Sequence, residues 1–353
     1  MTPAVFAIPG NIELRTGGYI YDRRVLALLP QHRIAVDHLP LPGGYPSPSQ
    51  DDLATTARLF AKLPRSTVLL VDGLAYGAMP TDVIARAASP IVALVHHPLC
   101  LETGLSAERQ AALKASETAA LAMARSVVVT SRVTARTLAA DFAVSGDKIT
   151  VAEPGTDPAP RAAGSAGGPL QLLSVGAIVP RKACDLLVRA LGALHNRDWR
   201  LTIAGPTDRS PEALAALQEA IAETGLADRI TLAGSVGWDR LARLYASADA
   251  FLMASLYEGY GMVLTEAMAC GLPIVCTTGG AAAETVPDDA AIKVPPGDVN
   301  ALATALGRAI GDATLRKQLA DVSWAAGQKL PRWEETACIV AGVIRSVAEE
   351  VAP

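Results

Sequence analysis

Short apolar runs alternate with amphipathic stretches along most of this 353-residue chain. Such alternation is typical of parallel sheets, because each crossover between parallel strands needs a dozen or more residues, usually a helix. The runs expected to be strands are Val5–Ile8, Val68–Val71, Ile91–Val95, Val127–Thr130, Leu170–Val175, Arg200–Ala204, Ile230–Ala233, Ala250–Ala254 and Pro273–Cys276. The helices expected between them are Asp51–Leu63, Ala107–Ala124, Cys184–Leu194, Pro211–Thr224 and Trp238–Ala246.

One stretch without periodicity interrupts this pattern. Gly155–Pro169, GTDPAPRAAGSAGGP, is rich in Gly, Pro, Ala and Ser, as linkers are. A chain of 353 residues also exceeds what one hydrophobic core usually holds. We therefore expect an α/β protein with two Rossmann-like domains, 1–160 and 161–330, facing a cleft, followed by a C-terminal helix within 331–353.

Composition excludes several classes of protein. Apolar residues make up 50% of the chain and charged residues 19%, so it is not intrinsically disordered. The net charge of −4 argues against nucleic-acid binding, which needs a basic surface. Five cysteines without CxxC spacing, no basic leader and no long apolar run predict a soluble, cytoplasmic protein. Without a strongly basic amphipathic helix, we expect at most weak peripheral contact with the inner face of a membrane.

The stretch Ser255–Val275, SLYEGYGMVLTEAMACGLPIV, carries the most specific chemistry. An apolar strand precedes it, a Gly-Tyr-Gly turn follows Glu258, and a helix is expected to start at about Met262. A strand, a glycine turn and a helix together aim backbone N–H groups and a positive helix end at an anion. Glu266 then lies in the first turns of that helix, out of phase with Glu258, so the two carboxylates would serve different parts of one ligand.

Two further groups of residues are typical of phosphate binding. Arg181 and Lys182 follow the first strand of the second domain, and cations balance the charge of a diphosphate. Gly17 and Gly18, in Thr-Gly-Gly-Tyr after the first strand, would let backbone approach a phosphate closely. The alternatives are a solvated basic pair and an ordinary turn. Neither GxGxxG nor GxxxxGK[ST] is present, which argues against a dinucleotide dehydrogenase and a P-loop NTPase.

His96 and His97 end an apolar strand, which places both imidazoles at the carboxyl edge of the first sheet. The alternatives are a structural pair of histidines or metal ligation. Adjacent histidines rarely share one ion, and no third ligand lies nearby in the sequence, so no metal site is expected.

Around Glu258 and Glu266, the sequences EGYG and EAMACGLPIV resemble the signature of family 4 retaining glycosyltransferases, which have the GT-B fold. The resemblance implies transfer of a hexose-type sugar from a nucleotide diphosphate sugar to an acceptor hydroxyl, with retention of anomeric configuration. It also implies that no cofactor or metal is needed and that the C-terminal helix packs back on the first domain. The family often has Arg where this chain has Ala177.

The resemblance implies a role for each candidate residue. Glu258 and His96 would be the catalytic residues, contacting the sugar, and Glu266 would accept hydrogen bonds from the ribose. The donor would also contact the remaining candidate residues, which are Gly17, Gly18, Arg181, Lys182, Gly259, Tyr260, Gly261, Met262 and Val263.

The first domain resembles the family only weakly, so carbohydrate, lipid-linked and small-molecule acceptors all stay open. The loops Leu39–Ser49 and Leu99–Leu105 are where we expect acceptor selection. Two alternative functions remain: a sugar-nucleotide epimerase or phosphorylase on the same fold, and a catalytically inactive subunit.

Overall fold

The computed structural model describes residues 1–165 and 167–350. The chain forms two compact units. The first comprises Met1–Gly155 together with the chain from Pro331 onward, and the second comprises Thr156–Leu330. The expected boundary at 160 therefore falls inside the second unit, five residues after Gly155.

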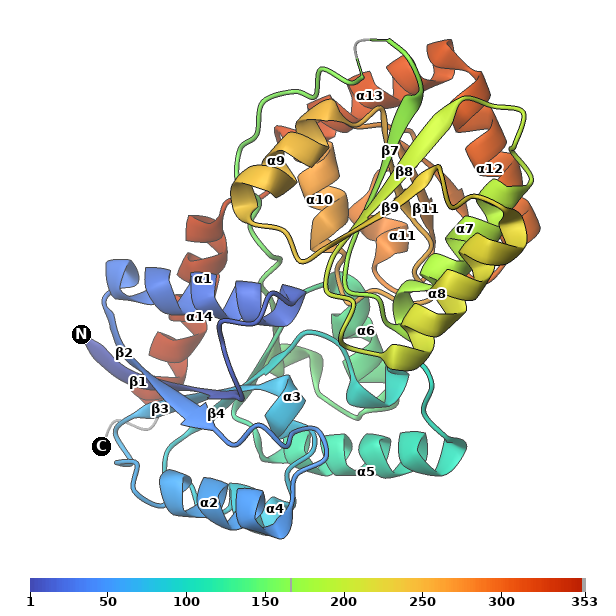
Figure 1. Ribbon diagram of the computed structural model, residues 1–353. Coiled ribbons are helices and arrows are strands. Elements are labelled where there is room, and N and C mark those ends of the chain that lie inside the picture. The colour runs from blue at the N-terminus through green and yellow to red at the C-terminus, as the bar shows by residue number, and fades with distance from the viewer. Residues whose placement is uncertain (166, 351–353) are drawn as a thin grey trace. The chain divides into compact units, whose positions relative to one another are not determined.

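The first unit is built on a parallel six-stranded sheet in the order β2-β1-β3-β4-β5-β6 (Figure 1). Its strands are β1 Thr2–Pro9, β2 Ile34–Leu41, β3 Val68–Asp72, β4 Ile91–Val95, β5 Ser126–Val129 and β6 Ile149–Val151. Its α-helices are α1 Gly17–Leu28, α2 Gln50–Phe60, α3 Gly73–Tyr76, α4 Thr81–Ile84, α5 Ala107–Met123, α6 Arg132–Asp141 and α14 Trp333–Glu350. Three short 3-10 helices are η1 Leu29–His32, η2 Leu99–Leu101 and η3 Gly146–Lys148.

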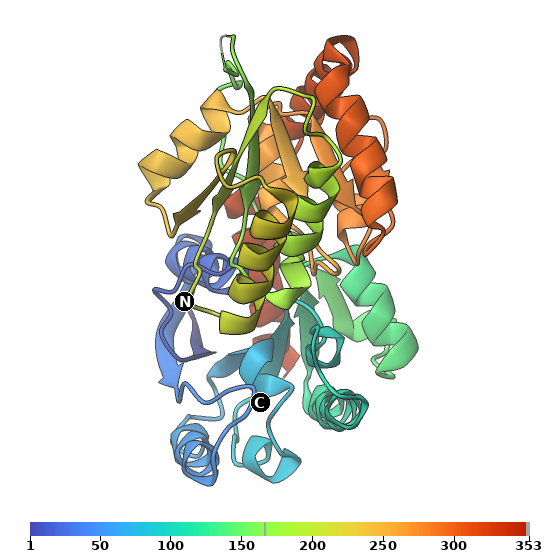
Figure 2. The same cartoon turned by 45° about the vertical axis from the view of Figure 1, so that its right-hand side comes forward.

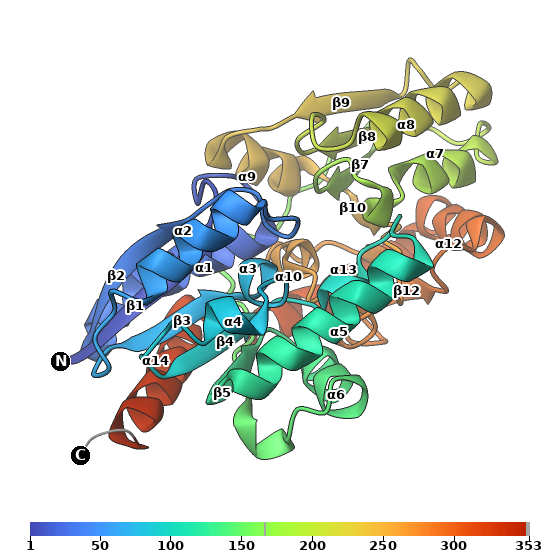
Figure 3. The same cartoon turned by 90° about the horizontal axis from the view of Figure 1, so that it is seen from below.

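Helices cover both faces of this sheet, because its central strands are apolar on both sides. On one face, Leu69 and Val71 of β3 pack with Phe60 of α2 and Leu113 of α5. On the other face, α14 lies beside α1 and contacts β1, β3, β4 and β5 (Figure 3). The C-terminal helix is thus an integral part of the core of the first unit.

Trp333 anchors the start of α14. Its side chain is 4% exposed, its ring meets Tyr21 edge-on at 5.8 Å between centroids, and the Arg24 guanidinium lies 5.7 Å from the ring centroid. Gly155 lies against the backbone of the same residue, so closely that a Cβ on Gly155 would be 2.2 Å from the Trp333 nitrogen. Only glycine allows these two backbone segments to approach so closely.

The second unit repeats the architecture with a parallel sheet in the order β12-β11-β10-β7-β8-β9. Its strands are β7 Leu170–Val175, β8 Trp199–Ala204, β9 Ile230–Gly234, β10 Ala250–Met253, β11 Ile274–Thr277 and β12 Ala291–Val294. Its helices are η4 Pro180–Lys182, α7 Cys184–Gly192, α8 Pro211–Thr224, α9 Trp238–Ser247, α10 Met262–Ala269, α11 Ala282–Thr285, α12 Val299–Gly311 and α13 Ala313–Gly327.

Alternate side chains of β10 enter two separate apolar clusters. Leu252 packs with side chains of α7, α8 and α12, which cover one face of the sheet (Figure 2). Phe251 and Met253 pack with side chains of α9 and α10 on the other face, where α13 also contacts α10. The period-2 alternation of the strand therefore distributes its side chains between two helical layers.

All nine strands expected from apolar runs are present; two have the expected bounds, and the ends of the others differ by at most three residues. Three strands were missed. In β2, Ile34–Leu41, polar residues and Pro40 interrupt the apolar pattern, as an edge strand tolerates. The other two, β6 and β12, are short edge strands. Among the described residues, no helix is long and apolar enough to span a bilayer.

Gly17 and Gly18, expected in a glycine loop after the first strand, instead lie at the start of a helix. These residues are the first two of α1, and the Thr16 side chain accepts a hydrogen bond from the Tyr19 N–H as the N-cap. A pair of glycines favours a loop, but Thr16 before them is a preferred N-cap residue and is the stronger indication of a helix start.

We predict that Gly155→Ala destabilises the first unit, because the added methyl group would push against the Trp333 backbone. A core or backbone overlap of this kind costs about 1–3 kcal/mol. Thermal unfolding should show a melting temperature lower by about 2–4 °C for each kcal/mol lost. Gly146→Ala is the matched control, since no heavy atom lies within 4 Å of its added Cβ. Equal melting temperatures for the two variants would contradict this account of α14 docking.

Candidate active site

The loop between β10 and α10 holds Glu258 by its backbone. The Glu258 N–H donates to the Gly279 carbonyl at 3.1 Å, and the Glu258 carbonyl accepts from the Ala281 N–H at 2.8 Å. Gly280, at φ +62°, is required for this contact, since a Cβ there would lie 2.3 Å from the Glu258 carbonyl oxygen. The turn after β11 therefore locks Glu258 in place. Its side chain is 7% exposed.

Two cations surround the Glu258 carboxylate. Lys182 Nζ lies 2.6 Å from Oε1, and Arg181 Nη1 lies 3.4 Å from Oε2. Burial alone would raise the pKa of Glu258, but the charges of Lys182 and Arg181 outweigh burial and hold that pKa below its usual range. The carboxylate is therefore ionised at neutral pH.

Arg181 and Lys182, expected from the sequence to balance the charge of a diphosphate, are paired with a carboxylate of the chain itself. Glu258 supplies the negative charge beside both cations. The basic loop is also tied to the glutamate loop by backbone, since the Leu256 N–H donates to the Arg181 carbonyl at 2.8 Å and Arg181 Nη1 donates to the Tyr257 carbonyl at 2.8 Å.

Helix α10 begins immediately after the glycine turn, at the expected Met262. Gly261 is its N-cap and adopts φ +92°, which explains a glycine at that position. The expected donor residues Gly259, Tyr260, Gly261, Met262 and Val263 thus form the turn and the first two residues of the helix. Their N–H groups include those that an α-helix leaves without intrahelical partners.

Glu266 lies on α10 and has a partner that the sequence did not suggest. The Tyr245 hydroxyl of α9 donates to Glu266 Oε2 at 2.8 Å. Burial raises the pKa of Glu266 to about 7, even though the hydrogen bond from Tyr245 opposes the shift. Tyr245 is thereby placed to orient the carboxylate, and Glu266 changes its charge near neutral pH.

In the first unit, His96 lies at the end of β4 beside α1. Gly18 makes room for the ring, because a Cβ on Gly18 would be 3.3 Å from His96 Cδ2. His96 Nε2 lies 3.2 Å from Asp22 Oδ1 and 3.5 Å from Asp72 Oδ2. His97 faces a different carboxylate, with its Nε2 3.4 Å from Glu102 Oε2.

The sequence argument that no further ligand lies near His96 does not hold in space. Asp72 ends β3, Asp22 belongs to α1, and both are at most 2% exposed. Together with His96 they are the one group of three potential metal ligands among the described residues. Strands β3 and β4 are neighbours in the sheet, so the sequence could have predicted that Asp72 lies near His96. The position of Asp22 could not be predicted in this way, because helix α1 was not expected.

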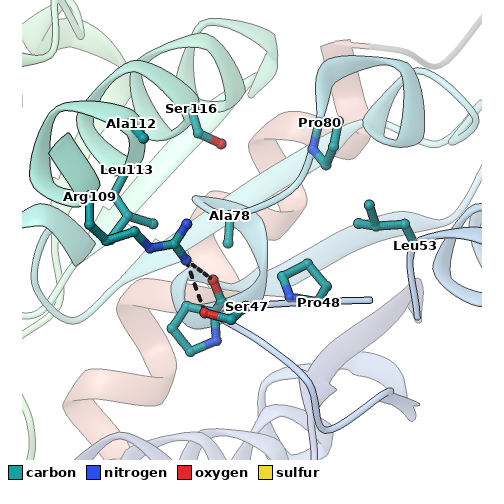
Figure 4. Close-up of a pocket in the computed structure, with 10 residues that line it drawn as sticks. Ser47, Pro48, Leu53, Ala78, Pro80, Arg109, Ala112, Leu113 and Ser116 are labelled. Carbon is teal, nitrogen blue, oxygen red and sulfur yellow. Dashed lines mark hydrogen bonds between the residues drawn. The ribbon is translucent and has the colours of Figure 1, made fainter. Parts of the chain in front are cut away.

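A cavity of about 340 Å³ in the first unit is lined in part by the loop expected to select the acceptor (Figure 4). Arg109 of α5 holds that loop, since its Nη2 donates to the Pro46 carbonyl at 2.8 Å and to Ser47 Oγ at 3.0 Å. The lining residues are Pro46, Ser47, Pro48, Leu53, Ala78, Pro80, Arg109, Ala112, Leu113 and Ser116.

Two solved structures share the fold of this chain. Sucrose-phosphate synthase from Thermosynechococcus elongatus superposes with a TM-score of 0.84 at 21% identity, over 99% of this chain and 100% of that chain. HepE from Anabaena, solved in complex with UDP-glucose, superposes with a TM-score of 0.75 at 18% identity, over 98% and 99% of the two chains. With its two parallel six-stranded sheets, the chain has the GT-B fold expected from the sequence.

Sequence comparison identifies similar protein families and relatives. Residues 169–312 match the model of glycosyl transferases group 1. The chain is also 34% identical over 235 residues to the D-inositol 3-phosphate glycosyltransferase of Nocardia farcinica, a match that covers 62% of this chain and 51% of that protein. The chain thus spans about half the length of this relative. Residues 169–312 are thus similar to the glycosyl transferases group 1 family, which confirms the resemblance seen around Glu258 and Glu266.

We predict that Lys182→Met lowers the free energy of unfolding at pH 7 by about 3 kcal/mol, because it leaves a buried carboxylate with Arg181 as its remaining cation. The folded-state pKa of Glu258 is depressed, so the ion pair stabilises the protein above the unfolded pKa of about 4.3 and loses its effect as pH falls through the folded pKa. Urea unfolding at pH 7 and pH 4 should show the gap between the two proteins narrowing.

Arg189→Met is the control for that experiment. Its partner Glu223 is 51% exposed, and an exposed ion pair contributes at most about 1 kcal/mol. Comparable losses in the two variants would contradict a special role for the Lys182–Glu258 pair.

Proposed function

We propose that this protein is a retaining glycosyltransferase that moves a hexose-type sugar from a nucleotide diphosphate sugar to an acceptor hydroxyl. The observation that carries the proposal is the buried cluster of Arg181, Lys182 and Glu258 immediately before α10, with Glu266 further along the same helix. The family of residues 169–312 supports it, as does the likeness to HepE, a protein solved with UDP-glucose.

Lys182 and Arg181 would receive the diphosphate of the donor. Both cations are already held at the edge of the sheet by Glu258 and by the backbone of the glutamate loop. A diphosphate would compete with Glu258 for Lys182 and release the carboxylate toward the sugar. Cleavage of the glycosidic bond leaves negative charge on the diphosphate, and stabilising that charge is the main electrostatic task. Gly17 and Gly18 would add backbone contacts to the donor.

Glu266 would accept hydrogen bonds from the ribose hydroxyls of the nucleotide. Tyr245 occupies Oε2, which leaves Oε1 for the ligand. The N–H groups of Gly259 to Val263 would serve the donor at the start of α10, where the helix dipole favours negative charge.

Glu258 would hold the hydroxyls of the transferred sugar, and His96 would contact the same sugar. Neither residue is proposed as a covalent nucleophile. We propose that the reaction needs no metal or other cofactor, since cations of the chain supply the positive charge that a metal would otherwise provide.

The acceptor would be a carbohydrate, a lipid-linked sugar or a small molecule that presents a hydroxyl group. The cavity beside Arg109 and the loop that it holds are where we propose that acceptor selection takes place. For localisation we propose the cytoplasm, with at most weak peripheral contact at the inner face of the membrane.

A thermal-shift screen against UDP, GDP, ADP and TDP and their hexose conjugates, without added metal, tests the donor site. A ligand of the folded state raises the melting temperature, by an amount equivalent to about 2.7 kcal/mol at one hundred times its dissociation constant. We expect one nucleotide class to give a shift that Glu266→Ala abolishes. Transfer from the matching sugar nucleotide should fall by orders of magnitude in Glu258→Gln, measured at a temperature where the variant is still folded. Absence of any shift in the folded protein, or full transfer activity in Glu258→Gln, would overturn the proposal.

Nucleotide affinity should also depend on pH through Glu266. Burial places the pKa of Glu266 at about 7, and the ionised carboxylate is the better acceptor for ribose hydroxyls, so affinity should rise between pH 6 and pH 8. Tyr245→Phe removes a hydrogen bond that favours the ionised form, so it should move the midpoint of that rise to higher pH. Calorimetric titration with the nucleoside diphosphate at several pH values measures this. A midpoint that Tyr245→Phe leaves unchanged would remove Tyr245 from the site.

A further inference from the structure

Asp22, Asp72 and His96 form a buried charged cluster that the donor site does not explain. Asp22 is fully buried and Asp72 is 2% exposed, while the His96 side chain is 20% exposed. Both carboxylates approach the same ring nitrogen, Nε2, at 3.2 and 3.5 Å. Only a protonated Nε2 can donate toward either of them.

The remaining atoms of the cluster show how its charge is arranged. Asp72 Oδ1 accepts the Leu74 N–H at 2.7 Å, as the N-cap of α3. Asp22 Oδ2 is buried, and no described residue gives it a hydrogen bond that would stabilise a negative charge on it. The cluster therefore favours a charged Asp72 and a neutral, protonated Asp22.

Charge balance then fixes the state of the histidine. Two ionised carboxylates beside a neutral imidazole would bury two negative charges, which is costly. A neutral Asp22, an ionised Asp72 and an imidazolium sum to zero. Burial and the neighbouring Asp72 raise the pKa of Asp22, which favours its neutral form. Burial alone would lower the pKa of His96, but the hydrogen bonds and charge of the acidic side chains beside it raise that pKa to about 10.

Among the described residues, no other titratable group in contact with the ring changes this balance. Tyr21 meets the His96 ring edge-on at 5.3 Å, and its hydroxyl donates to the Ala152 carbonyl at 3.0 Å. Burial raises the pKa of Tyr21, so it stays neutral. The His97 ring is engaged with Glu102.

We propose that Asp22 and Asp72 are positioning residues that hold His96 as a doubly protonated imidazolium, whose Nδ1–H is a fixed, charged donor for a ligand. An imidazolium cannot accept a proton, so His96 does not deprotonate the acceptor hydroxyl. Its chemistry is to donate a hydrogen bond to an oxygen of the sugar or acceptor and to stabilise negative charge there. This role toward substrate rests on the proposed function, whereas the protonation state does not.

The test is imidazole NMR on the full chain with carbon-13 and nitrogen-15 in its five histidines, followed from pH 5.5 to pH 9. The signals of His96 are assigned by their loss in His96→Gln. We expect His96 to keep imidazolium chemical shifts across the whole range. A His96 that titrates near its ordinary value of about 6.5 would overturn the proposal.

Variants separate the two carboxylates. Asp22→Asn keeps the neutral state proposed for Asp22, so His96 should stay protonated to above pH 8. The double variant Asp22→Asn and Asp72→Asn removes both acids at constant size, so His96 should titrate at or below pH 6.5. Glu102→Gln is the control, since it should alter the signals of His97 alone. Loss of the imidazolium in Asp22→Asn would show that Asp22 carries the charge and would overturn the assignment; this readout stands even if the double variant does not fold.

A metal ion is the competing occupant of the same three side chains. Titration with Zn²⁺ or Mn²⁺ that shifts or broadens the His96 signals to completion at one equivalent, and is reversed by a chelator, would replace the imidazolium by a metal site. Signals unchanged by metal support the proposal. If no sugar nucleotide binds and no transfer is found, the proposed function fails while the protonation result stands.

Discussion

The charge balance between Lys182, Arg181 and Glu258 is the interaction on which the candidate site depends. A buried carboxylate and two cations are tolerable only because each neutralises the other and because backbone groups fix their positions. The loops that follow β7, β10 and β11 meet at this cluster. The same arrangement that stabilises the folded chain holds two cations at the place where we propose that the donor diphosphate binds.

Each unit stabilises a buried charged group, but the two groups have opposite charge. In the second unit a carboxylate is surrounded by cations, and its pKa is depressed. In the first unit a histidine is surrounded by carboxylates, and although burial opposes it, the pKa of the histidine is raised. In both cases the charged group sits at the carboxyl ends of parallel strands, the edge at which open α/β sheets bind ligands.

Much of this fold was predictable from sequence because buried parallel strands are continuous apolar runs, as in Ile91–Val95 and Leu170–Val175. Edge strands are partly exposed and lose that pattern, which is why Ile34–Leu41 escaped. The glutamates and basic residues of the second unit were predictable because they lie in one short motif and one loop. Asp22 and Tyr245 were not, since each reaches its partner only through the tertiary packing of its helix.

The placement of α14 has a consequence for the order of folding during synthesis. The ribosome completes the whole of Thr156–Leu330 before it makes α14, although α14 contacts four strands and α1 of the first unit. Until α14 is made, the part of the first unit's sheet beneath it therefore stays uncovered, while the second unit already has all of its own residues. Translation thus favours completion of the later unit first, and leaves the apolar face beneath α14 as the surface that a chaperone would meet.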